Sequence, residues 1–271
     1  MKKGLLFFLP LAVAGALVAL QGLLPSEQAL MGWIQYQVLL LKFLSFACLL
    51  LAVSRFRPGD YLFWAWSFLA LEPALLLTKD LFFEDLAQVN LAGELEAGAL
   101  WTRAALTFAG NACDATGFIL LLNAARRAGL APAGRPAIRI IAIAGGITLA
   151  VLLAGPAIYS DGRVALAGSV RSLGDLFSDL GDAVSIVLVM PLLLRAWAFR
   201  GGLLIWPYAM IALAALSYLC YDIVWALGPS VWSELTVRRL DEFFRAAGLL
   251  YFCAAGISQT LIIPRRRASI P

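Results

Sequence analysis

The sequence predicts an all-α, polytopic membrane protein, a helix bundle with about eight transmembrane helices, and three observations support this prediction. The chain of 271 residues is 62% apolar and has a mean hydropathy of +0.87. Only 14% of its residues are charged, whereas a soluble domain carries about a quarter. Several apolar segments reach the roughly 20 residues that a helix needs to cross about 30 Å of hydrocarbon. We therefore expect a single integral membrane domain, residues 1–271.

Eight apolar segments account for the predicted helices, taken in chain order. The first, at 4–24, follows two lysines as a signal peptide would, but its apolar run is longer than the roughly 7–15 residues of a signal-peptide core. We therefore expect a retained helix there. The other seven are expected at 31–54, 61–79, 101–125, 138–158, 173–197, 203–226 and 244–263.

The distribution of lysine and arginine predicts that both termini face the cytoplasm, because basic residues accumulate on that side of a membrane. With the N-terminus inside, the inner segments hold 13 of the 21 basic residues and a single acidic residue, Asp60. The outer segment at 79–98 carries five acidic residues and one lysine. The amphipathic connections at 79–100 and 229–243 are expected to lie as helices on the membrane surface. The predicted location is the bacterial cytoplasmic (inner) membrane, with a multi-pass topology.

Two of the predicted spans share a pattern that suggests an internal repeat. The segment "GNACDATGFILLLNAARRAG" at 110–129 aligns with "SDLGDAVSIVLVMPLLLRAW" at 178–197, and each runs through apolar residues to a basic end. Lys42 occupies the corresponding position of an earlier span. The chain would then consist of three related helical hairpins that enter the membrane from the same side. The aligned polar pairs are Asn111 with Asp179 and Asp114 with Asp182.

Polar and charged residues recur at similar depths inside the predicted spans. A charge at mid-membrane costs at least about 2.5–3.5 kcal/mol on insertion scales, so such groups face the bundle interior and acquire partners. Asp175, Asp179 and Asp182 follow i, i+4, i+7 spacing and should share one helix face. The candidate binding residues are Lys42, Glu72, Asn111, Asp114, Asp175, Asp179, Asp182, Tyr218 and Asp222.

These residues allow two interpretations. In the first, they line a wet cavity that opens to the outside and ends near Lys42 and Asp114. One lysine among several acids cannot neutralise them all, so this interpretation requires a bound proton or cation. In the second, the same groups hold helices together through hydrogen bonds and ion pairs, and have no other function.

The residue types that the sequence lacks exclude several classes of catalytic and cofactor site. It contains no histidine, which removes the central residue of His-ligated haem, His-based zinc sites and Ser–His or Cys–His catalysis. The four cysteines lie one apiece in four apolar segments with no CxxC pair, a distribution typical of helix packing. We expect no cofactor, leave the presence of a metal open and disfavour an enzyme, for which Asp114 and Asp182 would be the acid–base pair.

The C-terminal part of the chain resembles a known family. The segments "LGDAVSIVLVMPLLLRAWAFRGGLLIWPYAMIALAALSYLCYD" and "RRLDEFFRAAGLLYFCAAGISQ" are similar to the last three helices of multi-helix membrane sensor modules of bacterial diguanylate cyclases and histidine kinases. In this resemblance Asp182, Asp222 and residues 240–259 occupy the corresponding positions. The chain departs from the family at "PRRRASIP", where a linker and a catalytic output domain would begin. The resemblance therefore implies a sensor module that acts through a partner protein.

Three functions remain open at this point. The first is a membrane-embedded sensor or signal-coupling module with an outward-facing polar cavity. The second is a proton- or cation-coupled transporter or channel, because intramembrane acids often mark ion pathways. The third is a non-catalytic subunit of a membrane protein assembly. The expected partners are the lipid bilayer and either a membrane or cytoplasmic protein or a second copy of the chain. The basic C-terminus is expected to contact lipid rather than nucleic acid.

Overall fold

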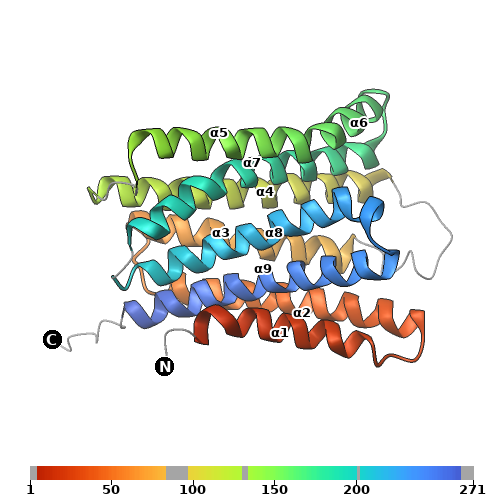
Figure 1. Cartoon of the computed structure of the whole chain (residues 1–271), viewed down its shortest axis with the longest axis horizontal. Coiled ribbons are helices and arrows are strands. Elements are labelled where there is room, and N and C mark those ends of the chain that lie inside the picture. Colours follow the sequence, from red (N-terminus) through yellow and green to blue (C-terminus); the bar gives the residue numbers. More distant parts are fainter. Residues whose placement is uncertain (1–4, 84–96, 130–133, 200–201, 264–271) are drawn as a thin grey trace.

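The computed structural model describes residues 5–83, 97–129, 134–199 and 202–263, and every regular element within them is a helix. The fold is therefore all-α in these segments, as the sequence predicts (Figure 1). The helices are α1 (Leu5–Gln21), α2 (Glu27–Val53), α3 (Tyr61–Phe82), α4 (Ala97–Arg127), α5 (Pro136–Leu153), α6 (Gly155–Leu166), α7 (Val170–Ala198), α8 (Ile205–Val231) and α9 (Glu234–Ile262).

The long helices run alternately in opposite directions, so their ends gather at the two ends of the bundle (Figure 1). At one end α2, α4, α7 and α9 end, and α1, α3, α5 and α8 begin. We call this the basic end because seven arginines of the described residues belong to its helix ends and connections: Arg55, Arg57, Arg126, Arg127, Arg135, Arg139 and Arg195. The predicted cytoplasmic orientation assigns this end to the inside of the cell.

Within the described part of the chain, six helices are long and apolar enough to cross a membrane: α2, α3, α4, α5, α7 and α8. α1 is apolar but shorter, and α9 is not among the six. Large apolar side chains remain exposed on the outer surface, among them Ile141 at 70% and Val151 at 64%, which is the surface expected of a chain surrounded by lipid. The chain is thus a multi-pass membrane protein, while eight crossings remain a prediction.

The expected span at 138–158 is wrong in its last five residues, 154–158. α5 ends at Leu153, and a separate helix, α6, begins at Gly155. Pro156 lies in the first turn of α6 and has no N–H to donate to the carbonyl of residue 152, so a continuous helix would lose a hydrogen bond there. None of the residues of α6 is buried.

The expectation of a separate surface helix at 229–243 is also wrong. α8 continues to Val231, and α9 begins at Glu234 and runs without interruption to Ile262. The hydroxyl of Ser233 accepts a hydrogen bond from the backbone N–H of Thr236 at 3.4 Å, and this cap starts the helix that enters the core. Most of the other expected surface helix, at 79–100, lies outside the described residues.

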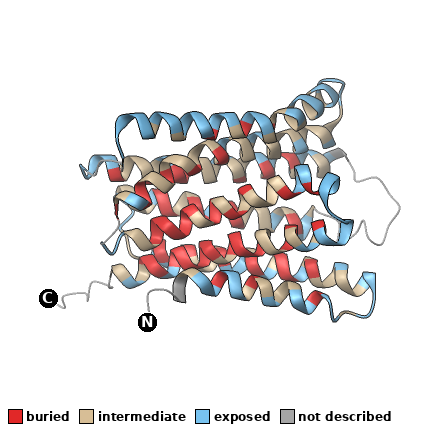
Figure 2. Cartoon of the chain, viewed as in Figure 1, coloured by how far each residue is buried: buried red, intermediate tan, exposed pale blue. Residues whose placement is uncertain are grey.

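α9 occupies the centre of the packing, and it is among the most buried helices in Figure 2. It packs against α1, α2 and α8. The Ser45 hydroxyl of α2 donates a hydrogen bond to the carbonyl of Leu249 at 2.8 Å, and the Tyr251 hydroxyl donates to the carbonyl of Phe7 in α1 at 2.9 Å. A Cβ on Gly256 would lie 2.2 Å from the backbone oxygen of Cys48. α9 and α2 therefore approach to a distance that only glycine permits.

Candidate functional site

A cavity of about 230 Å³ lies where α2, α3, α4, α7, α8 and α9 meet. We call it the polar cavity because most of its lining carries polar or charged groups. Its depth follows from helix geometry: Lys42 and Asp182 each lie 13 residues from an arginine at the basic end, roughly 20 Å at 1.5 Å per residue. The polar lining residues are Lys42, Glu72, Lys79, Thr107, Asn111, Asp114, Ser178, Asp182, Ser185, Tyr218, Tyr221, Asp222 and Arg245.

The structure brings seven of the nine predicted binding residues to this cavity: Lys42, Glu72, Asn111, Asp114, Asp182, Tyr218 and Asp222. Asp175 and Asp179 do not line it. Asp175 is exposed, and Asp179 lies beside Asp161 of α6. From α7, the polar residues Ser178, Asp182 and Ser185 line the cavity. The sequence predicts a different face of this helix, with Asp175, Asp179 and Asp182.

Lys42 forms an ion pair with Asp80 of α3. The ammonium of Lys79 lies 3.8 Å from the other carboxylate oxygen of Asp80. Sequence reasoning assigned Asp80 to the outer surface because it ended the span at residue 79, whereas α3 continues to Phe82 and buries this carboxylate to 8% exposure. Continuing the helical spacing from Glu72 through Leu76 would have placed Lys79 and Asp80 on the same side of α3.

Glu72 is buried on α3 and is followed by Pro73 inside the helix. Its carboxylate lies within electrostatic range of Lys42, Asp80 and Asp114. Proline has no N–H, so the carbonyl of Leu69 loses its usual intrahelical donor beside this acidic side chain. α3 therefore combines a buried acid with a local weakness in its own backbone ladder.

α4 and α7 approach each other closely where Asn111 lies against Gly181. The side-chain amide of Asn111 donates a hydrogen bond to the carbonyl of Phe177 at 2.9 Å. A Cβ on Gly181 would lie 2.1 Å from the same amide nitrogen, so only glycine leaves room for it. Asn111 thus connects the two helices directly, while its position also places it on the cavity wall.

The surroundings of Asp114 satisfy only part of its carboxylate group. One of its carboxylate oxygens, Oδ2, accepts a hydrogen bond from the Ser185 hydroxyl at 3.4 Å. The other, Oδ1, is buried and has no hydrogen-bond partner among the described residues. A buried polar atom without a partner costs about 1–3 kcal/mol, and more when it is charged. A proton, a cation or a ligand donor at Oδ1 would remove this cost.

The wall opposite α4 is formed by α8 and α9. Tyr218, Tyr221 and Asp222 line it from α8, and Arg245 lines it from α9. Arg245 is ion-paired with Glu242 one turn earlier. Sequence reasoning did not select Arg245, because it stood at the border of the predicted surface helix. Its spacing to Leu249 and Phe252, at i+4 and i+7, places all three on one face of α9, and this signal could have identified it.

Acidic groups outnumber basic groups around the cavity. Three basic side chains line it, Lys42, Lys79 and Arg245, against four acidic ones, Glu72, Asp114, Asp182 and Asp222. Asp80 and Glu242, which pair with two of the basic groups, raise the acidic count from four to six. A cavity with this imbalance favours a positively charged occupant. Among the described residues, no group of three cysteine or acidic side chains is arranged to hold a metal ion.

No protein-family model, no curated protein and no solved structure matches this chain. The fold and the site together therefore define the class, an all-α multi-pass membrane protein with a polar cavity in its interior. The resemblance to bacterial sensor modules remains a prediction.

Proposed function

We propose that this protein is a membrane-embedded sensor or signal-coupling module. In this proposal the polar cavity binds a small cation or cationic molecule. Binding changes the position of α9, and a partner protein responds to this change. The observation that carries the proposal concerns Asp114, which lines this acid-rich cavity and whose buried Oδ1 has no hydrogen-bond partner among the described residues. The proposed setting is a bacterial inner membrane with both termini inside and the cavity open to the outside.

The position of α9 supports transmission of a signal. Arg245, Leu249 and Phe252 of this helix line the cavity, so an occupant would contact α9 directly. From the cavity the helix continues to the basic end, where its last residue is Ile262. Because α9 and α2 are in close contact at Gly256, a movement of α9 there would also displace α2. A rotation or shift of α9 on binding would therefore also change the structure at the basic end, where we expect a partner to bind.

Ligand binding can be tested with Asp114→Asn. Thermal unfolding of the purified protein in detergent would be measured with Na⁺, K⁺, methylammonium and guanidinium as probes. We expect one of these cations to stabilise the wild type, by about 2.7 kcal/mol at 100 times its dissociation constant. Asp114→Asn, on α4, should abolish this response, and the control Asp175→Asn, at an exposed position of α7, should keep it. Equal responses of the two variants, or none from the wild type, would contradict the proposal.

A proton- or cation-coupled transporter is the second candidate function. The pairing of buried Glu72 with Pro73 favours it, because a weakened backbone beside an acid is suited to movement during transport. Flux in proteoliposomes separates the two functions: a sensor binds the cation without net flux, and a transporter moves it. A third function, a non-catalytic subunit of a membrane assembly, predicts neither binding nor flux but co-purification with a stable protein partner.

A further inference from the structure

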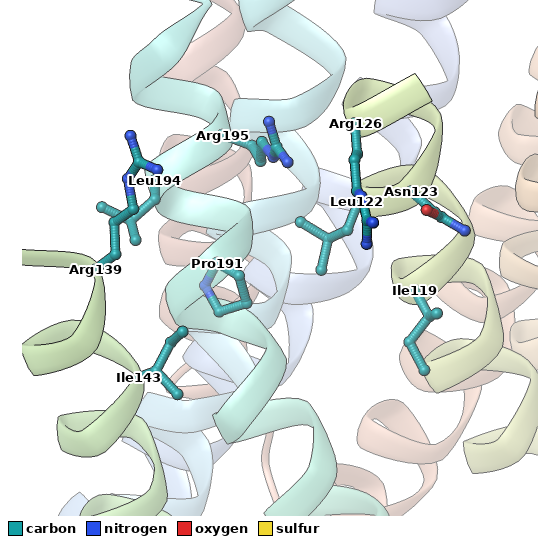
Figure 3. A pocket seen from close by; sticks show the side chains of 9 residues that line it. All are labelled: Ile119, Leu122, Asn123, Arg126, Arg139, Ile143, Pro191, Leu194 and Arg195. Atoms are coloured by element: carbon teal, nitrogen blue, oxygen red, sulfur yellow. The ribbon is translucent and has the colours of Figure 1, made fainter. Parts of the chain in front are cut away.

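A second cavity, of about 290 Å³, lies between α4, α5 and α7 near the basic end (Figure 3). None of its lining residues lines the polar cavity. We call it the arginine pocket because each of the three helices contributes one arginine. Its lining residues are Ile119, Leu122, Asn123, Arg126, Arg139, Ile143, Pro191, Leu194 and Arg195.

The lining of the arginine pocket is ordered by depth. Arg126, Arg139 and Arg195 lie at the level nearest the basic end. Ile119 precedes Arg126 by seven residues, which places it roughly 10 Å deeper along α4, and Ile143 lies about 6 Å deeper than Arg139 along α5. The pocket thus presents cations at its outer level and apolar groups below them.

The pocket has an excess of positive charge that its own lining does not balance. Among its nine described lining residues none is acidic. Arg195 is only 9% exposed and lies close enough to Arg126 and Arg139 for mutual electrostatic repulsion. An anion placed among these three guanidinium groups would lower their mutual repulsion, and most strongly at the buried Arg195, because water screens charges less there. Guanidinium groups are well matched to phosphate because they can donate two parallel hydrogen bonds.

Arg126 is set apart from its neighbour Arg127 on α4. The guanidinium of Arg127 lies over the ring of Tyr61, 4.5 Å from its centroid, and so is directed to α3. Asn123 donates a hydrogen bond to the hydroxyl of the same tyrosine at 3.1 Å. Two arginines adjacent in sequence therefore have different surroundings, and only Arg126 lines the pocket.

The pocket opens sideways to the surface that would contact lipid. Ile119 is 51% exposed and Ile143 is 42% exposed, although both line the pocket. Next to them on α5, Ile140 and Ile141 are also exposed apolar side chains. An occupant with an anionic head and an apolar body could reach the arginines from the bilayer without crossing the protein interior.

We infer that the arginine pocket binds an anionic phospholipid, with its headgroup phosphate among Arg126, Arg139 and Arg195 and an acyl chain against Ile119 and Ile143. Basic pockets between transmembrane helices near the cytoplasmic surface are suited to acidic headgroups. Such a lipid would also hold α5 in place, because the buried residues of this helix are only Gly146 and Ala150. The inference is independent of the function proposed for the polar cavity.

Native mass spectrometry of the full chain in detergent tests this inference. The protein would be titrated with phosphatidylglycerol and, separately, with phosphatidylcholine of the same acyl chains. We expect the wild type to prefer phosphatidylglycerol and the double variant Arg126→Gln/Arg139→Gln to lose roughly thirtyfold in affinity for it. The matched control Arg127→Gln removes a positive charge at the same depth but outside the pocket, and should keep the preference.

Two outcomes would overturn the inference. The first is an equal loss in the Arg127→Gln control, which would mean that general surface charge attracts the lipid. The second is displacement of phosphatidylglycerol by millimolar inorganic phosphate, which would mean that the pocket takes a free anion rather than a lipid. Arg126 is exposed and Arg139 is half-buried, so their variants should fold; the buried Arg195 is left unchanged for this reason. If the double variant does not fold, Arg126→Gln alone should still lose several-fold in affinity, and an unchanged affinity would overturn the inference.

Discussion

At the residue scale, the polar cavity depends on a few positions where side-chain size and charge are tightly constrained. Asp114 keeps one carboxylate oxygen buried without a partner among the described residues, while its other oxygen accepts from Ser185. Lys42 is already committed to Asp80. The acids that remain in the cavity therefore cannot rely on this lysine alone, which is the physical reason for expecting a cationic occupant.

Gly181→Ala should destabilise the protein. A Cβ at this position would lie 2.1 Å from the Asn111 amide nitrogen, so the asparagine must move and give up its hydrogen bond to Phe177. We expect a loss of about 1–3 kcal/mol in the free energy of unfolding, measured by chemical denaturation in mixed micelles.

Gly174→Ala on the same helix is the matched control, because its new Cβ would have no neighbour closer than 3.6 Å. It should be neutral or slightly stabilising, since alanine favours a helix over glycine. Equal losses from the two variants would show that α7 tolerates no substitution of glycine, and would remove the specific role given to Asn111.

At the element scale, the structure differs from the sequence-based expectation mainly at helix ends. Pro156 ends α5 early, and the Ser233 cap starts α9 ten or more residues before the predicted span. Both differences concern residues that the sequence analysis considered for the polar cavity or that line it. Asp161 of α6 lies beside Asp179, which does not line the polar cavity. Arg245, at the start of the predicted span, lies well inside the longer α9 and lines the polar cavity.

Gly256→Ala should separate α9 from α2. Its Cβ would lie 2.2 Å from the backbone oxygen of Cys48, and backbone cannot rotate away as a side chain can. We expect a loss of about 3 kcal/mol or more in stability, read as a lower thermal unfolding midpoint in detergent.

Gly145→Ala in α5 serves as the comparison, because nothing lies within 4 Å of its new Cβ. Helix propensity alone predicts a gain of up to about 1 kcal/mol there. If Gly256→Ala were as stable as Gly145→Ala, the close approach of α9 and α2 would be absent, and the route proposed for the signal would fail with it.

At the scale of the whole molecule, the alternating helices collect the basic connections at one end (Figure 1). The first described helix begins at that end and the last one finishes there. The positive-inside rule predicts that the basic end faces the cytoplasm. The polar cavity lies roughly 20 Å from this end along the helices.

Reporter fusions test this orientation. A fluorescent protein joined after residue 271 should fluoresce, and an alkaline phosphatase joined at the same point should be inactive, because the phosphatase folds only outside the cytoplasm. A phosphatase inserted after residue 90, in the acidic outer segment, should be active. The reverse pattern would invert the topology, and would place the arginine pocket on the outer side of the membrane.

The sequence by itself determined the all-α membrane class and most helix positions, because span length and hydropathy are properties of contiguous residues. It also identified seven residues that share one cavity, since charges inside apolar segments have to face the interior. It could not determine which face of each helix meets which neighbour. Successive residues of an α-helix are rotated by about 100° around its axis. Which of the resulting faces meets a neighbouring helix depends on contacts with segments that are distant in the sequence.

Only the tertiary structure decided that Lys42 pairs with Asp80, that Arg245 joins the cavity and that Asp175 and Asp179 do not. These outcomes depend on close approaches such as Gly181 with Asn111, which no composition or spacing encodes. The arginine pocket likewise depends on the tertiary structure. Arg126 and Arg139 lie on either side of one connection, but Arg195 belongs to a later helix, and the three form a single site because α4, α5 and α7 come together around the pocket.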